Sequence, residues 1–221
     1  MAFLFNDCTS LESVNLKGFK TDKVYSLYRV FNNCHSLKSL DLSMFNTSSL
    51  REMISIFQNC SSLESLDLSN FNTELIDSMA YAFKDCRSLK YLNVKGFNTS
   101  ILRNMDQMFA NCSSLESLDL STFNTSKIED MSSLFYNCSS LTSLNLAGFK
   151  THNLRRMNYM FYSCSSLRSL DLHMFNLDKV YNYIYVFGEC FDLKLTVDSA
   201  HFGKLLDSLP DNVSYIDYKD N

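Results

Sequence analysis

All eight cysteines of this chain are separated by one constant interval of 26 residues, from Cys8 to Cys190. A phenylalanine precedes each cysteine by three positions, and a leucine follows each cysteine by three. The stretches CSSLESLDLSNFNT at Cys60 and CSSLESLDLSTFNT at Cys112 differ at a single position. A fixed period of roughly 20 to 50 residues is typical of solenoids, propellers and repeat arrays. The repeat therefore constrains the fold before any single motif does.

Each repeat contains two different hydrophobic periods. In LESLDL, at residues 63–68, leucines alternate with Ser65 and Asp67, which predicts a short half-buried strand. Residues 102–109 carry apolar side chains at steps of three and four, which predicts one face of a helix, short or partly 3₁₀, or of a tight helical coil. The FNTS between these segments, as at residues 123–126, predicts a corner, because Asn tolerates turn dihedrals and Thr or Ser can cap a helix.

One repeat by itself buries too little apolar surface to fold, so the repeats are expected to stack into a continuous core. We divide the chain into a remnant of a preceding repeat at residues 1–7, seven 26-residue repeats at residues 8–189, and a partial eighth repeat with a C-terminal cap at residues 190–221. The apolar spacing of the tail predicts a short helix and a last strand. No N-terminal cap is recognised, which raises the possibility of self-association through that end, or of a chain cut from a longer one.

Composition and charge exclude several classes of protein. The chain is 46% apolar and 20% charged, which is enough to bury a core. Its net charge of -4 is spread out, so nucleic acid is not an expected partner. No apolar run approaches the length of a membrane-spanning helix, and MAFLFNDC has no basic segment of a signal peptide. We therefore expect no direct membrane insertion and recognise no signal peptide or anchor in this chain.

The pattern L-x-x-L-x-L-x-x-F, repeated along residues 3–197, resembles a leucine-rich repeat. The 26-residue register FxxCxSLxSLDLSxFNTSxLxxMxxMF is similar to the BspA-like group of bacterial surface proteins. The resemblance implies an α/β solenoid: a right-handed coil with a parallel β-sheet on its concave face and short helical or 3₁₀ segments on its convex face. It also implies a location at the cell surface or outside the cell, and an adhesive or binding role with variable ligands. Where most leucine-rich repeats hold Asn or Cys, this chain holds Phe, so stacked rings are expected to replace the amide ladder there (Phe45, Phe71, Phe97, Phe123).

The cysteines allow three interpretations, of which we favour a ladder of free, buried thiols. Disulfides are the second, but stacked equivalent cysteines point the same way, which disfavours the disulfide geometry. A metal site is the third, but a spacing of 26 residues never gives the C-x-x-C of zinc sites. The methionine column that includes Met105 and Met131 is interpreted as core rather than as a thioether site. No metal and no cofactor are expected.

No catalytic constellation is recognised, so the chain is not expected to be an enzyme. The outward positions of the predicted strands carry small hydroxyls beside Asn or Asp, with one tyrosine, and they form the candidate binding face: Ser39, Asp41, Ser65, Asp67, Tyr91, Asn93, Ser117, Asp119, Ser143 and Asn145. These side chains either support the stack through bonds to adjacent turns, or form a polar groove for a protein or glycan, or bind Ca²⁺, for which the Gly-rich turns are missing. The leading functional prediction is a non-enzymatic, adhesin-like binding scaffold. The alternative is a structural segment that self-associates or spaces other domains.

Overall fold

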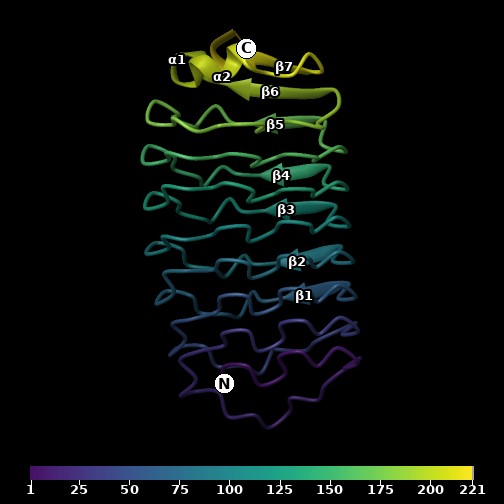
Figure 1. Ribbon diagram of the computed structural model, residues 1–221. Helices are drawn as coiled ribbons and strands as arrows, with labels where there is room; N and C mark the ends of the chain where they lie inside the picture. Colours follow the sequence, from purple (N-terminus) through teal and green to yellow (C-terminus); the bar gives the residue numbers. More distant parts are fainter. Residues whose placement is uncertain (221) are drawn as a thin grey trace.

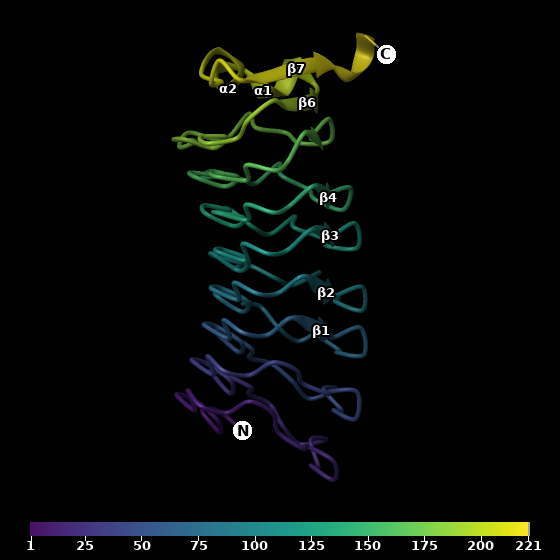
Figure 2. The same cartoon turned by 90° about the vertical axis from the view of Figure 1, so that its right-hand side faces the viewer.

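The computed structural model describes residues 1–220 as a column of stacked coils, with the N-terminus at one end and the C-terminus at the other (Figure 1). Each coil is one 26-residue repeat, because equivalent strand residues lie side by side, as Ser65 does with Tyr91. A view from the side shows the coils stacked in the same order along the column (Figure 2). The predicted solenoid of leucine-rich repeats is confirmed.

The strands are short, and every pairing between them is parallel. They are β1 (Ser65–Asp67), β2 (Tyr91–Asn93), β3 (Ser117–Asp119), β4 (Ser143–Asn145), β5 (Ser169–Asp171), β6 (Leu193–Val197) and β7 (Val213–Asp217). Regular ladders join β1 to β2, β3 to β4, and β5 to β6 to β7. The strands occupy one side of the column, which we call the strand face, and the other long side is the turn face (Figure 1).

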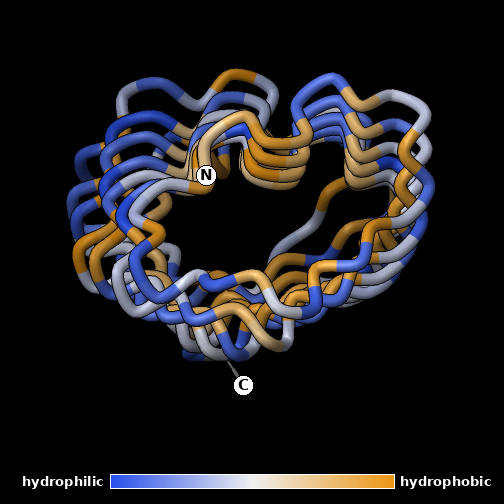
Figure 3. The backbone as a smooth tube through the Cα atoms, turned by 90° about the horizontal axis from the view of Figure 1, so that it is seen from below, coloured by the Kyte–Doolittle hydropathy of each residue, from blue (hydrophilic) through white to orange (hydrophobic). Residues whose placement is uncertain are grey.

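Seen along the column, each coil forms an oblong loop (Figure 3). The repeated Leu, Met, Cys and Phe side chains are buried. The phenylalanines three positions before the cysteines form a continuous stack from Phe5 to Phe187, with ring centroids 5.3 to 5.8 Å apart. The phenylalanines expected to form a ring spine, Phe45 to Phe123, are buried too. Stacked rings occur in only part of that column, at Phe97–Phe123 and further on at Phe149–Phe175, with ring centroids 6.1 Å apart in both pairs. The main aromatic column therefore lies in the run of turns that precedes each cysteine.

An amide ladder is also present, in a column that sequence reasoning did not consider. The residue before each cysteine has a positive φ, as in Asn59 (60°) and Asn111 (61°). The Asn59 amide donates to the Asn33 side chain at 2.7 Å, and the Asn137 amide donates to the Asn111 side chain at 3.0 Å. Asn suits this position because it tolerates the left-handed conformation and offers both a donor and an acceptor.

The helical segments predicted within the repeats are not present; those residues form consecutive tight turns. Each repeat has two residues with positive φ four positions apart, as Ser55 (54°) and Asn59 (60°), and each one interrupts a right-handed helix before a second turn can form. The backbone N–H groups instead reach across to the next coil, as Phe57 donates to the carbonyl of Ala82 at 2.9 Å. Apolar spacing of three and four residues identified the buried face correctly but could not distinguish a helix from this chain of turns.

The FNT corner is confirmed as a turn, but its threonine does not cap a helix. The Asn98 side chain accepts the N–H of Ser100 at 3.1 Å and so closes the corner. The Thr99 hydroxyl accepts the N–H of Asn124 at 2.7 Å and donates to the carbonyl of the same residue at 3.3 Å. The threonine is therefore a buried bridge between successive coils, and the same pair of bonds recurs at Thr125 and Thr151.

The tail contains the predicted helix and strand, with the helix divided in two: α1 (Ser199–Phe202) and α2 (Lys204–Asp207), followed by β7 and the 3₁₀-helix η1 (Tyr218–Asp220). Phe202 and Leu205 are buried against the last coil, and β7 pairs with β6. The division of the chain at residues 7 and 189 stays a prediction.

Candidate functional site

The outward positions predicted as a binding face form one column on the strand face. Strands β1 to β4 supply Ser65, Asp67, Tyr91, Asn93, Ser117, Asp119, Ser143 and Asn145, and parallel pairing places Asp67 beside Asn93 and Asp119 beside Asn145. Ser39 and Asp41 lie in the preceding coil and are exposed as well. The central leucines of the strands point inward, as at Leu66 and Leu118. The period-two prediction therefore placed these residues on the correct face.

The Asn and Asp side chains of this column each close the turn that follows their strand. Asp67 accepts the N–H of Ser69 at 2.9 Å, and Asp119 accepts the N–H of Ser121 at 3.0 Å. These bonds favour the ionised carboxyl, so the backbone N–H of Ser69 lowers the pKa of Asp67, and the Ser121 hydroxyl lowers the pKa of Asp119. The Asn93 side chain likewise accepts the backbone N–H of Lys95, at 3.3 Å. The column therefore has a structural role whether or not it also binds a partner.

Two hollows lie on this face near the N-terminal end of the column. One, of about 440 Å³, is lined by nine residues that include Ser39, Asp41, Ser65 and Asp67. The neighbouring hollow, of about 310 Å³, contains Asp41 and the Met44 side chain. Four predicted residues are thus brought together in one concavity, whereas Asn145 lines a separate, smaller hollow of about 80 Å³ together with Asp171 and His173.

Two apolar side chains stand out from this polar face. Tyr91 is 55% exposed on β2, and Met44 is 76% exposed two coils earlier, so both are available to a partner. Sequence reasoning identified Tyr91 but missed Met44. The signal was present, because the position of Met44 varies from repeat to repeat (Gly18, Asn70, Gly96, Thr122, Gly148, Met174), as expected for a side chain outside the core.

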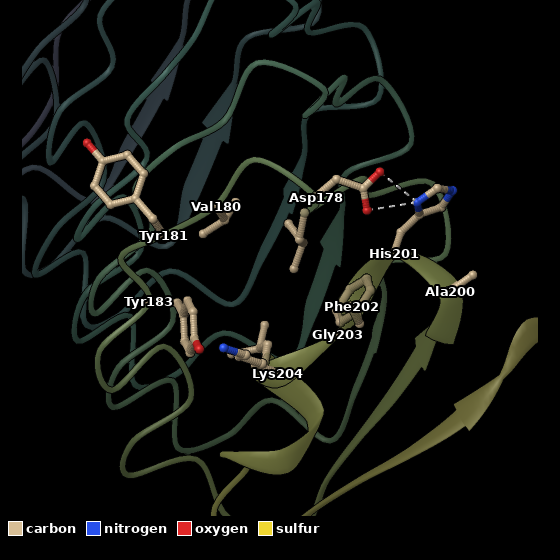
Figure 4. A pocket seen from close by; sticks show the side chains of 11 residues that line it. Asp178, Val180, Tyr181, Tyr183, Ala200, His201, Phe202, Gly203 and Lys204 are labelled. Atoms are coloured by element: carbon tan, nitrogen blue, oxygen red, sulfur yellow. Dashed lines mark hydrogen bonds and ion pairs between the residues drawn. The ribbon is translucent and has the colours of Figure 1, made fainter.

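A third cavity, of about 450 Å³, lies at the other end of the molecule, between residues 177–183 and the helices α1 and α2 (Figure 4). His201 and Asp178 lie at its edge, with Nδ1 of the imidazole 3.1 Å from the carboxylate, and this contact lowers the pKa of Asp178. The Lys204 and Tyr183 side chains point toward each other across the opening. An adjoining, more apolar cavity of about 540 Å³ shares Tyr181, Tyr183 and Leu205 with it.

The cysteines form the predicted ladder of free thiols. All eight are free, and the seven from Cys34 to Cys190 are buried. Each of these seven donates its S–H to the carbonyl of the phenylalanine 29 residues earlier, at 3.1 to 3.2 Å. Among residues 1–220, no three His, Cys, Asp or Glu side chains cluster as metal ligands would.

The sequence matches the family described as "Mycoplasma protein of unknown function, DUF285" over residues 1–117 and 77–202. No curated protein matches it. Within residues 1–220, no helix combines the length and apolar character that crossing a membrane requires.

Several solved structures are similar to this chain. A leucine-rich cell surface protein from Faecalibacterium prausnitzii A2-165 is 17% identical over 81% of the chain and 38% of that protein, with a TM-score of 0.43. A leucine-rich repeat protein from Bacteroides ovatus ATCC 8483 is 17% identical over 97% of the chain and 80% of that protein, with a TM-score of 0.28. The TLR13–ssRNA13 complex gives 14% identity over 97% of the chain and 45% of that protein, with a TM-score of 0.29. The chain thus spans less than half the length of the Faecalibacterium protein.

Proposed function

Because this chain belongs to the DUF285 family, described as Mycoplasma proteins of unknown function, and carries the 26-residue leucine-rich repeat of the BspA-like group, we propose that it is a non-enzymatic binding scaffold. It engages a protein or glycan partner through the strand face, in the manner of an adhesin. The solenoid supplies a rigid column, and the short strands present one outward row of side chains per coil.

The observation that carries this proposal is the hollow that unites Ser39, Asp41, Ser65 and Asp67, with Tyr91 exposed on the next strand. Small hydroxyls and carboxylates offer hydrogen bonds, and an exposed tyrosine offers a rigid, amphipathic contact of the kind that dominates many interfaces. The arrangement suits recognition rather than chemistry, since Asp41 and Asp67 are already engaged as turn acceptors.

The resemblance to BspA-like proteins supports a location at the cell surface, where a protein or glycan partner would be met. The face has no block of positive charge, so nucleic acid is not the proposed partner.

The test is a binding screen against a glycan array and a panel of soluble ectodomains. The informative variant is Tyr91→Ala with Asp67→Asn, because the asparagine keeps the acceptor for Ser69, as Asn93 does in its own coil. We expect loss of a specific binder with an unchanged melting temperature. The matched control is Tyr25→Ala, which removes a tyrosine that is 67% exposed and lies outside the strand face's candidate residues. Equal losses in both variants, or no binder for the unmodified chain, would contradict the proposal.

Self-association or spacing of other domains is the second candidate function. It is favoured by Phe3 and Leu4, which are 50% and 47% exposed in the first coil. Sedimentation velocity over a range of concentrations distinguishes the two functions, because self-association through this surface would be reduced by Phe3→Ser with Leu4→Ser and unaffected by Tyr91→Ala.

A further inference from the structure

On the turn face, each coil donates backbone hydrogen bonds to the coil that follows it. The sixth repeat, residues 138–163, shows the complete set: the N–H groups of Met157, Tyr159, Phe161 and Ser163 donate to the carbonyls of Asn182, Ile184, Val186 and Gly188 at 2.7 to 2.9 Å. Donors and acceptors both recur at every second residue. The same ladder joins the earlier coils, as Phe57 donates to Ala82 and Asn59 to Lys84, with single gaps such as Met53 and a double gap at Met105 and Gln107.

The next coil breaks this rule. Its equivalent N–H groups belong to Tyr183, Tyr185, Phe187 and Glu189, and none of them has an acceptor in the part of the chain that the structure describes. The cause is the path of the chain after Cys190, which enters β6 and then α1 and α2 instead of another run of turns. The ladder therefore ends in a row of backbone donors, and such groups strongly favour pairing.

The apolar cavity of about 540 Å³ lies along this row. Its lining includes Tyr183, Tyr185 and Phe187 from this row, and Leu209 and Pro210 from the segment after α2. Ile184 and Tyr185 are 54% and 64% exposed here, although both are large and apolar or aromatic. A ligand that satisfied the donors would at the same time cover these side chains, and burial of such a surface is favourable.

A positive charge lies beside the start of the row. Lys204 lines the adjoining cavity together with Tyr181 and Tyr183, and its amino group makes no ion pair within residues 1–220 (Figure 4). An acidic group of the ligand would therefore be favoured near residues 181–183, ahead of the apolar contacts with Ile184 and Tyr185.

We propose that this edge is a docking site for an extended peptide segment of a partner protein, with an acidic side chain followed by apolar ones. The segment runs parallel to residues 182–188 and supplies the carbonyls that a further coil would have supplied. A peptide fits better than a glycan because the donors repeat every second residue, as the carbonyls of an adjacent peptide backbone do in the inner coils. The site is separate from the strand face, so the result of its test does not affect the function proposed above.

The probe is a synthetic peptide with the sequence of residues 127–137, KIEDMSSLFYN. Within the protein this segment already occupies the equivalent edge of an inner coil, where Leu134 and Tyr136 accept the N–H groups of Phe109 and Asn111 at 3.2 and 2.7 Å. Placed in the same register on the last coil, its Glu129 and Asp130 would lie next to residues 181 and 182, on the side of Lys204. The expected result is slower amide hydrogen exchange at Tyr183, Tyr185 and Phe187, by roughly tenfold at saturation, measured by NMR on the full chain.

Two variants and two controls make the test specific. Ile184→Arg places a charged side chain at the apolar wall and should abolish the protection, and Lys204→Glu should weaken peptide binding by roughly threefold or more. Tyr25→Arg and Lys194→Glu alter exposed residues away from the edge and should leave binding unchanged. A peptide with Gln and Asn in place of Glu129 and Asp130 should bind the unmodified chain more weakly.

Three results would overturn the proposal. The first is no protection at about 1 mM peptide, which corresponds to an affinity too weak for specific docking. The second is protection that persists in Ile184→Arg. The third is protection of the same amides without peptide at high protein concentration, together with oligomers, which would identify the occupant as a second copy of this chain.

Discussion

The thiol of Cys86 donates a hydrogen bond to the backbone carbonyl of Phe57, with the sulfur 3.1 Å from the oxygen. The same oxygen accepts the N–H of Cys60, also at 3.1 Å, so one carbonyl closes a turn in its own coil and binds the coil above. The small size of cysteine lets it lie between two layers, and its S–H satisfies an acceptor that a purely apolar residue would leave with one partner. The ladder of thiols is therefore part of the hydrogen-bonding scheme as well as of the core.

Stability should fall at alkaline pH because of these thiols. Burial raises the pKa of Cys34 and Cys190 to about 11 and that of Cys112 to about 12, from an ordinary value of 9.0. Below pH 9 the thiols are neutral in both the folded and the unfolded state, so the free energy of unfolding is unaffected by them. As the pH rises from 9 toward 11, thiols ionise only in the unfolded chain, which favours unfolding. Urea denaturation at several pH values measures this decline.

Lysines and tyrosines titrate over the same range, so the cysteine contribution needs its own control. A variant with Cys112→Ser and Cys138→Ser cannot form two of the thiolates, and its loss of stability with pH should be shallower than that of the unmodified chain. Parallel curves for the two proteins would show that the buried thiols are not responsible.

The aromatic column should behave as a coupled unit. Phe109 is fully buried and stacks on Phe83 and Phe135, with ring centroids 5.6 and 5.7 Å away. Phe109→Ala should lower the free energy of unfolding by about 3–5 kcal/mol, whereas Phe109→Leu, which fills most of the space, should cost less. A double-mutant cycle with Phe83→Leu tests the coupling: purely additive effects would mean that the stacking itself contributes nothing beyond burial.

The buried threonine hydroxyls between coils should contribute to the free energy of unfolding through their hydrogen bonds. Thr125 accepts the N–H of Lys150 at 2.8 Å and donates to its carbonyl at 3.1 Å, in a fully buried position. Thr125→Val keeps the shape but leaves both backbone groups unpaired, which we expect to cost about 2–4 kcal/mol. Thr125→Ser retains the hydroxyl and should cost less than half as much. Thermal denaturation of the Thr125→Val and Thr125→Ser variants measures the difference. Equal losses of stability in the two variants would mean that packing, not the hydroxyl, is responsible.

Gly148 lies at a close approach of two coils, although other repeats carry Asn70, Thr122 or Met174 at the equivalent position. A Cβ at Gly148 would lie 2.4 Å from the carbonyl oxygen of Ser121 and 2.5 Å from that of Phe123, both of them backbone atoms that cannot turn aside. Gly148→Ala should therefore destabilise the protein strongly. Gly18 occupies the same repeat position with a φ of +85° and open space around it, so Gly18→Ala should cost only about 1–2 kcal/mol of backbone strain. Similar melting temperatures for the two variants would contradict this reading.

The repeat period predicted the parts of the fold that depend on equivalent residues lying over one another. Because Leu66 and Leu92 occupy the same column, their strands had to be parallel and in register, and the structure shows this pairing. The outward column of Ser65 and Asp67 followed from the alternation in LESLDL in the same way. Free thiols followed from the parallel orientation of stacked cysteines.

The features that the sequence did not reveal depend on which groups the backbone hydrogen bonds join. The apolar spacing of residues 102–109 is the same for a helix and for a chain of tight turns, and only the positive φ at residues such as Gln107 separates them. Asparagine before cysteine was the available signal, since Asn favours that conformation. The site at Tyr183 and Tyr185 was missed for a related reason, because a row of backbone donors without acceptors leaves no trace in side-chain patterns.

The regular repetition of the coil-to-coil bonds has a consequence for the length of the molecule. On the turn face each layer donates to the layer after it, as Phe57 does to Ala82, and near the strands it donates to the layer before it, as Lys90 does to Glu64, so the internal layers share the same two kinds of junction. Duplication or removal of a whole 26-residue unit, for example at the near-identical stretches that follow Cys60 and Cys112, would leave every junction intact. The reach of such a rod can therefore be lengthened or shortened in fixed steps without redesign of its ends.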